Sequence, residues 1–97
     1  MRLARKGEWI MQHYLSIHHE SETPREVIEK RWSKLAVERR SIWVKTWFHR
    51  ASGKRFCWWN APDREMLEAV FRDHGVPWRV IVAVNLTTPA EWRWRED

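Results

Sequence analysis

The sequence predicts an α+β domain built from four β-strands and two helices in the order β-α-β-β-α-β. Two stretches, residues 21–40 and 63–75, have apolar residues at helical spacing together with recognisable start signals. Four other stretches are rich in aromatic and β-branched residues, as strands are. At 97 residues the chain is long enough for one such domain with a core of its own.

The first strand and the first helix come from the first 40 residues. Residues 9–19, WIMQHYLSIHH, are aromatic and branched, which predicts a strand. The helix that follows begins with a capping-box pattern of Thr23 and Glu26, with Pro24 at its first position. Its apolar stripe recurs at helical spacing: Val27, Ile28, Trp32, Leu35 and Ala36.

A hairpin is expected in the middle of the chain. Residues 41–49, SIWVKTWFH, have the composition of a strand, and residues 55–60, RFCWWN, form the strand that returns. Between them lies RASGK, where Gly53 supplies a backbone conformation that a side chain resists.

The second helix and the last strand complete the pattern. Pro62 and Asp63 open the helix, Gly75 ends it, and residues 79–87, RVIVAVNLT, form the fourth strand. This order is the ferredoxin-like arrangement, with a four-stranded antiparallel sheet and both helices on one face. The other face is left uncovered, which favours pairing of two copies as a dimeric α+β barrel.

Pairing of the two hairpin strands assigns their residues to faces. If Phe48 lies opposite Phe56, one face is a plausible helix-facing core. It holds Ile42, Val44, Thr46, Phe48, Phe56 and Trp58. The other face mixes indoles with polar groups, which favours a pocket or a dimer interface. It holds Trp43, Lys45, Trp47, His49, Cys57 and Trp59. A shift of one residue would exchange these partners.

The predicted domain spans residues 9–88, between a basic extension at 1–8 and a tryptophan-bearing tail at 89–97. The basic start lacks the continuous apolar stretch of a signal peptide, and the longest aliphatic run, 80–84, is too short to span a membrane. One cysteine excludes an internal disulfide and fits a reducing compartment. We therefore expect a soluble cytoplasmic protein with no membrane partner.

Charge and tryptophan content indicate the class of partner. The net charge is +5, but acidic residues lie among the basic ones as on an ordinary solvated helix face, so we expect no nucleic-acid partner. Nine tryptophans are more than one small core holds easily, which predicts a homodimer or a bound ligand. They are residues 9, 32, 43, 47, 58, 59, 78, 92 and 94.

The stretch WFHRASGKRFCWWNAPDREML, followed by HGVPW, resembles a family of small bacterial nickel-binding, ferredoxin-like proteins of largely uncharacterised function. The shared pattern is an aromatic residue before His49, a Gly-Lys turn, an aromatic-Cys strand, an Ala-Pro-Asp helix start and a Gly-x-Pro helix end. The likeness covers about residues 9–88 and implies a dimeric α/β sandwich that holds a divalent metal ion. Some relatives carry a histidine pair in the second helix, where this chain has Val70 and Phe71.

Histidines at strand ends are the candidate metal ligands. His49 ends the second strand near Cys57, and His18 also falls at a position that resembles the family. His13 and His19 share one side of the first strand and His18 the other, so they cannot all face one way. Neutral imidazole suits nickel and other divalent transition metals. The alternative is that the histidines are exposed polar strand ends and Cys57 a small buried apolar residue.

The sequence therefore predicts a homodimer that binds nickel or another divalent transition metal ion through histidines at the sheet edge. The alternative is a protein that binds a flat aromatic ligand, or acts on it as a small enzyme, in a pocket of Trp43, Lys45, Trp47 and Trp59. A basic interaction module is a third interpretation. No catalytic residue is identified, and whether the protein is an enzyme stays open.

Overall fold

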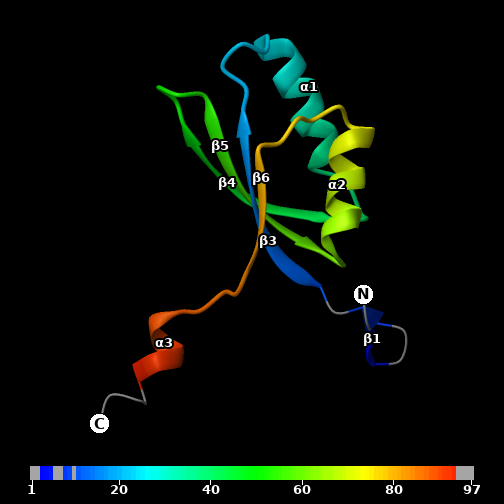
Figure 1. Ribbon diagram of the computed structural model, residues 1–97, viewed down its shortest axis with the longest axis vertical. Coiled ribbons are helices and arrows are strands. Elements are labelled where there is room, and N and C mark those ends of the chain that lie inside the picture. The colour runs from blue at the N-terminus through cyan, green and yellow to red at the C-terminus, as the bar shows by residue number, and fades with distance from the viewer. Residues whose placement is uncertain (1–2, 6–7, 10, 94–97) are drawn as a thin grey trace.

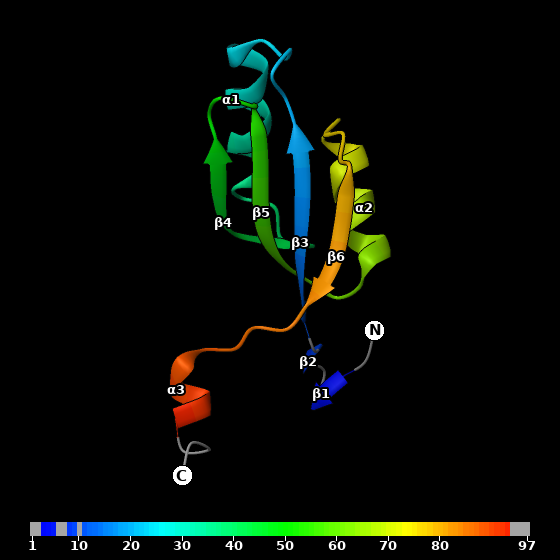
Figure 2. The same cartoon turned by 60° about the vertical axis from the view of Figure 1, so that its left-hand side comes forward.

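Four antiparallel strands form one sheet, and two helices cover one of its faces (Figure 1). The computed structural model describes residues 3–5, 8–9 and 11–93, with side chains from residue 11 onward. The strands lie in the order β4-β5-β3-β6, and Figure 2 shows them side by side with α1 and α2 behind. The predicted α+β class with four antiparallel strands is confirmed. The elements of the domain are β3 (Gln12–His19), α1 (Arg25–Leu35), β4 (Ile42–His49), β5 (Lys54–Ala61), α2 (Arg64–Asp73) and β6 (Val80–Val84).

The two helices begin in different ways. At α2 the prediction is correct, because the Asp63 carboxylate accepts a hydrogen bond from the backbone N–H of Met66 at 2.8 Å. At α1 the predicted capping box does not form: Pro24 is the cap residue, and no side chain caps the helix. The Pro24 carbonyl instead accepts the first backbone hydrogen bonds, from Val27 and Ile28. None of the helices among the described residues is long and apolar enough to cross a membrane.

Aromatic rings fill the space between the sheet and the helices. The indole of Trp59 is fully buried and meets the ring of Phe71 edge-to-face, with 5.1 Å between centroids. Trp32 of α1 contacts both Trp43 and Trp59, which also stack on each other, so the three indoles form one cluster. Such ring pairs add stability beyond the apolar area that they bury. The other fully buried apolar members of the core are Leu35, Cys57, Ala61, Leu67 and Val70.

A buried carboxylate that was not predicted, that of Glu20, lies directly after β3. Glu20 accepts hydrogen bonds from Arg31 and Arg55, both at 3.0 Å, and from the indole N–H of Trp32 at 3.1 Å. Its side chain is only 1% exposed. Arg55 also stacks over the Trp32 ring. The carboxylate therefore joins β3, β5 and α1 through charge-assisted bonds.

The predicted strand pairing in the hairpin is wrong by one residue. The backbone N–H of Gly53 donates to the His49 carbonyl at 2.9 Å, which places His49 opposite Lys54 and Trp47 opposite Phe56. The register also shifts by one residue between Trp43 and Lys45. Because side chains alternate between faces, this displacement exchanges the faces of the returning strand.

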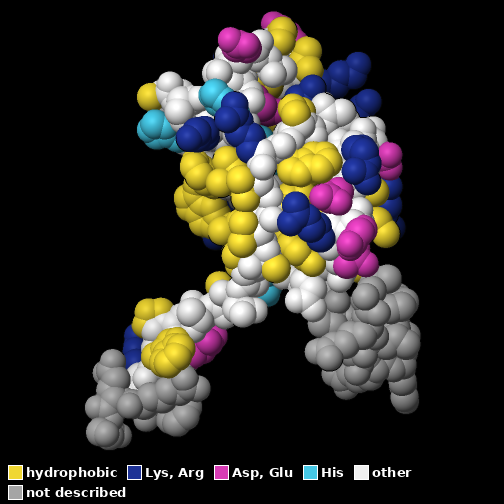
Figure 3. All heavy atoms as spheres, in the orientation of Figure 1, with side chains coloured by type: hydrophobic (Ala, Val, Ile, Leu, Met, Phe, Trp, Pro, Cys, Tyr) yellow, Lys and Arg dark blue, Asp and Glu magenta, His cyan; other side chains and the backbone are white. Residues whose placement is uncertain are grey.

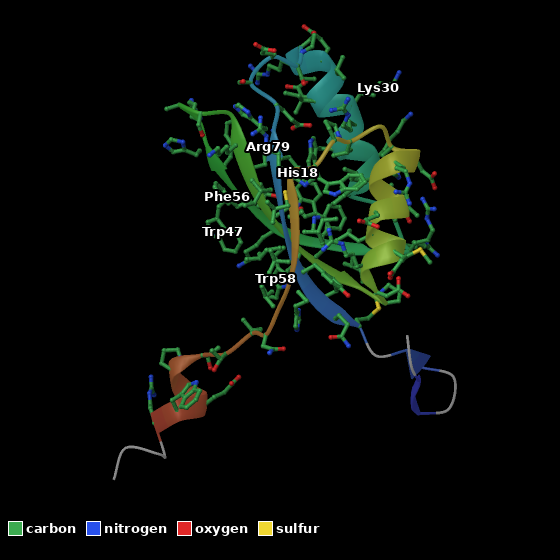
Figure 4. All side chains as sticks on the ribbon, in the orientation of Figure 1. His18, Lys30, Trp47, Phe56, Trp58 and Arg79 are labelled. Carbon is green, nitrogen blue, oxygen red and sulfur yellow. The ribbon has the colours of Figure 1, made fainter. Side chains whose placement is uncertain are left out.

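The exchange decides which aromatic residues face outward. Cys57 and Trp59 point toward the helices, whereas Phe56 and Trp58 share the uncovered side with Trp47 (Figure 4). We call this uncovered side the open face. By strand pairing its residues are His13, Leu15, Ile17, His19, Ile42, Lys45, Trp47, His49, Lys54, Phe56, Trp58, Asn60, Val80, Val82 and Val84. Figure 3 shows hydrophobic side chains gathered there, with basic and histidine side chains beside them toward the hairpin turn.

Replacing Gly53 with alanine is expected to lower the free energy of unfolding by about 2–3 kcal/mol. Gly53 has φ 72°, and an added Cβ would lie 2.7 Å from the Cβ of Ser21 and 2.9 Å from its Cα. Gly75→Ala is the matched control, because Gly75 has φ 68° but no atom within 4 Å of the added Cβ. Its loss should stay near 1 kcal/mol, the conformational part alone. Urea unfolding of both variants measures the difference; equal losses would show that the contact with Ser21 imposes no constraint.

Two further segments lie outside the four-stranded sheet. Before it, β1 (Leu3–Arg5) pairs with β2 (Glu8–Trp9). The first strand of the sheet was predicted to begin at Trp9, but it begins at Gln12, and Trp9 belongs to β2. After the sheet, residues 85–88 lead to a short helix, α3 (Pro89–Trp92), in the tail for which no structure was predicted. Trp94 and the end of that tail lie outside the described residues. Both segments leave the same end of the sheet, because His13 pairs with Val84 (Figure 1).

Candidate functional site on the open sheet face

The five residues predicted as metal ligands do not converge. His13, His19 and His49 lie on the open face, whereas His18 and Cys57 point toward the helices. His19 and His49 both pair with Lys54, so a whole strand separates them. Among the described side chains, no group of three histidine, cysteine, aspartate or glutamate residues is placed to hold a metal ion. The described part of one copy therefore does not present a complete site.

His18 is a buried structural residue. Its Nδ1–H donates to the carbonyl of Pro77 at 2.8 Å, and its Nε2 accepts from the Ser16 hydroxyl at 2.7 Å. Ser16 Oγ in turn accepts from the indole N–H of Trp59 at 3.0 Å. Burial lowers the pKa of His18, so the ring is neutral with both nitrogens occupied. Its lone pair is therefore not available to a metal ion.

The helix side of His18 is closed by an apolar ring. Phe71 packs edge-on against the imidazole, with 4.9 Å between ring centroids. Phe71 and Val70 occupy the positions at which the family resemblance places a histidine pair in some relatives, and both are fully buried. In this chain the surroundings of His18 therefore offer packing and no second imidazole.

The thiol of Cys57, like the imidazole of His18, is buried and hydrogen-bonded. The Thr46 hydroxyl donates to Sγ at 3.0 Å, and Thr46 itself accepts from the indole N–H of Trp43 at 2.7 Å. Burial raises the pKa of the Cys57 thiol to about 11. A thiol that stays protonated at neutral pH is a poor nucleophile and a poor metal ligand. The structure thus fits the interpretation of Cys57 as a small buried core residue.

The histidines of β3 on the open face have occupied lone pairs. The indole N–H of Trp58 donates to Nδ1 of His13 at 3.1 Å. The guanidinium of Arg79 donates to Nδ1 of His19 at 3.2 Å, and the other ring nitrogen of His19 meets the Ser21 hydroxyl. A metal ion would have to displace these bonds to bind either ring.

His49 differs from them in its hydrogen bonding. Its Nδ1 lies 2.7 Å from the Ser52 hydroxyl oxygen, which also accepts from the backbone N–H of Lys54 and donates to the His49 carbonyl. In the tautomer that carries its proton on Nδ1, His49 donates to this oxygen. In that tautomer Nε2 carries the lone pair, and the His49 side chain is exposed. Metal-binding histidines are commonly oriented in this way by a partner on the other nitrogen.

The predicted ligand pocket is not brought together either. Trp43 and Trp59 pack in the core, whereas Lys45 and Trp47 lie on the open face. Lys45 Nζ is 5.9 Å from the ring centres of both Trp47 and Trp58, within cation–π range. A hollow of about 440 Å³ does lie on this face, and His13, Leu15, Trp47, Trp58, Val84, Asn85 and Leu86 line it.

Most of this hollow was not predicted, because the predicted register of the hairpin placed Trp58 on the wrong side of the sheet. The adjacent pair Trp58 and Trp59 contains no alternation that would separate the two faces. The alternation in β3 would not have corrected the error, because the apolar Leu15 and Ile17 lie on the open face whereas the polar Ser16 and His18 are buried.

Comparison with known proteins places the chain in a family. Residues 11–84 match the family described as SCO4226-like, nickel responsive protein SCO4226-like. The crystal structure of SCO4226 from Streptomyces coelicolor A3(2) is similar in fold, with a TM-score of 0.65 at 22% sequence identity. This match covers 78% of the present chain and 99% of the other. The comparison with curated proteins finds no match. The resemblance predicted from the hairpin is thereby confirmed, and the chain belongs to the SCO4226-like family of nickel-responsive proteins.

Proposed function

We propose that this protein is a ferredoxin-like homodimer of the dimeric α+β barrel type that binds nickel or a similar divalent transition metal ion. The observation that carries the proposal is His49. It lies on the open face, its Nδ1 is hydrogen-bonded to the Ser52 hydroxyl, and its side chain is exposed. The family description, which names nickel, supports the choice of metal.

A second copy would add donors to those that the described part of one chain presents. A zinc-like or nickel-like site needs at least three protein donors, and His49 offers one. Packing of two open faces would bring a second set of histidines to the same interface. His13 and His19 also lie on this face and could join after exchanging their present hydrogen bonds. The apolar side chains exposed there favour such packing, because it removes them from water.

Tag-free protein is expected to bind Ni²⁺ in calorimetric titration with less than one ion per chain, and His49→Ala should abolish or strongly weaken that binding. His74→Ala is the matched control, because His74 lies behind the sheet at the end of α2, where it contacts Glu38. Imidazole ligands must be neutral, so binding should weaken as the pH falls. Equal affinity of the wild-type and His49→Ala proteins would remove His49 from the site.

The hollow on the open face favours a second candidate function. Its lining is largely apolar, with two indoles and the imidazole of His13, and this composition suits a flat aromatic ligand. Lys45, beside both indoles, could fix an acidic group of such a ligand. Binding of an aromatic carboxylate by metal-free protein, lost in Trp47→Ala and retained in His49→Ala, would support this function over the first.

A further inference from the structure

Three aromatic side chains are neighbours on the open face. Phe56 and Trp58 project from β5, one of the two central strands of the sheet, and Trp47 of β4 lies opposite Phe56. Trp47 is 53% exposed and Phe56 is 37% exposed, and Figure 4 shows all three side chains on the side away from the helices. Opposed Cβ atoms in a sheet lie about 5 Å apart, and those two residues along a strand about 7 Å, so the rings form one aromatic surface.

The neighbours of Trp58 fix its ring and place a positive charge beside it. Its indole N–H donates to Nδ1 of His13 at 3.1 Å, and the two ring centres are 5.6 Å apart. The ammonium group of Lys45 lies 5.9 Å from the ring centre of Trp58 and equally far from that of Trp47. Two rings of the surface therefore share one cation.

The charged side chains around these rings are basic. Within the described part of the four strands, the open-face residues include the exposed Lys45 and Lys54 and no aspartate or glutamate. Arg79 adds a guanidinium group, which contacts His19 on this face at 3.2 Å. Figure 3 shows basic and histidine side chains next to the hydrophobic ones here.

The fold separates charges that alternate along the sequence. Acidic residues lie among the basic ones in the chain, which is why no nucleic-acid partner was expected. In the structure, the carboxylates of the described side chains lie in the helices, in the loops beside them, or after β6. The open face is thus left with positive charge alone, which attracts polyanions.

Exposed aromatic rings among cationic side chains suit the chemistry of a single nucleic-acid strand. Its unpaired bases stack on aromatic rings, and its phosphates attract lysine and arginine. Domains that bind single-stranded RNA on a four-stranded sheet commonly stack two or three bases on aromatic side chains of the sheet. A duplex satisfies the charge but offers no free base for stacking.

We propose that the open face of a single copy binds a single strand of nucleic acid. Bases stack on Trp47, Phe56 and Trp58, and the phosphates lie beside Lys45 and Lys54. This inference goes beyond the proposed function and does not depend on it. Because a second copy of the chain would use the same face, the dimer and the bound strand exclude each other.

Fluorescence anisotropy of a labelled single-stranded RNA of about eight adenylates tests the inference. Phe56→Leu keeps an apolar side chain but removes the stacking ring, so it should raise Kd at least about fivefold. Phe48→Leu is the matched control and should leave Kd unchanged. Phe48 is 49% exposed, but it lies on the other side of the sheet, under Arg55.

A pair of lysine variants tests the charges in the same assay. For the unaltered protein, log Kobs should fall against log salt with a slope of about −1.4 to −2, that of two or three phosphate contacts. Lys54→Gln should raise Kd and make this slope less steep by about 0.7. Lys30→Gln, at an exposed position of α1, should change neither.

Four results would overturn the inference. They are equal effects of Phe56→Leu and Phe48→Leu, equal affinity for the adenylate–uridylate duplex, absence of RNA binding at low salt, and binding of phosphatidylserine vesicles in place of RNA. Sedimentation velocity separates the inference from the proposed function. RNA should dissociate any dimer, and a dimer that binds RNA and stays intact would also overturn the inference. A dimer that forms but binds no RNA leaves the proposed function standing, whereas a monomer that binds RNA refutes only the dimer.

Discussion

Glu20→Ala is expected to lower the free energy of unfolding by about 3–5 kcal/mol, the usual cost of removing one partner from a buried ion pair. The side chain of Glu20 is 1% exposed, and those of Arg31 and Arg55 are 17% and 19% exposed. Without the carboxylate, two guanidinium groups and the Trp32 indole N–H lose their shared acceptor in a site that water hardly reaches.

Glu29→Ala provides the matched control for that experiment. Glu29 also pairs with an arginine, Arg25, at 2.8 Å, but their side chains are 62% and 88% exposed. An exposed pair of this kind contributes about 0.5 kcal/mol or less. Urea unfolding should therefore separate the two variants by several kcal/mol. If they differ little, the Glu20 cluster is solvated in solution, and its buried position does not determine the stability of the fold.

His18→Ala is expected to cost about 3–5 kcal/mol at neutral pH and to abolish one component of acid sensitivity. The first effect combines a cavity with the loss of partners for the Ser16 hydroxyl and the Pro77 carbonyl. The second follows from titration: burial lowers the pKa of folded His18 below 6.5, the value of an exposed histidine. Below pH 6.5 His18 binds a proton in the unfolded chain but stays neutral in the folded chain, so the free energy of unfolding decreases as the pH falls.

The pH window makes the measurement specific. His18 should act from pH 6.5 downward, with at most about 1.4 kcal/mol per pH unit. Glu38 acts later: its hydrogen bond from Arg40 lowers its pKa from 4.5 to about 2, so its contribution is lost only between those values. Unfolding curves at pH 7.5, 6.5 and 5.5 for the wild type, His18→Ala and the exposed His19→Ala separate the groups. A slope that persists in His18→Ala would assign it to another residue.

The sequence predicted elements wherever a local signal determines them. Asp63 and Gly75 mark the two ends of α2, and the structure agrees at both. The register of the hairpin could not be predicted in the same way, because it depends on how many residues the turn takes up and on the irregularity between Trp43 and Lys45. An error of one residue in the register made the prediction place Trp58 in the core and Trp59 on the opposite face, whereas the structure has Trp59 in the core.

The candidate site shows the same division. Alternation along β3 correctly separated His18 from His13 and His19. Which imidazole nitrogen is free depends on partners that the fold brings from elsewhere: Pro77 for His18, Trp58 for His13 and Arg79 for His19. Such partners lie between 45 and 60 residues away in the chain, so no pattern within one strand reveals them.

Because Cys57 is buried, its reactivity reports how often the core of the protein opens to solvent. The thiol is completely shielded at the centre of the core, and it is the single cysteine of the chain. A thiol-specific reagent can therefore modify the native protein only in those molecules in which the sheet has separated from the helices. When closing is faster than modification, the rate of labelling is proportional to the population of opened molecules. The rate of Cys57 alkylation thus measures transient opening of the aromatic core without an engineered probe.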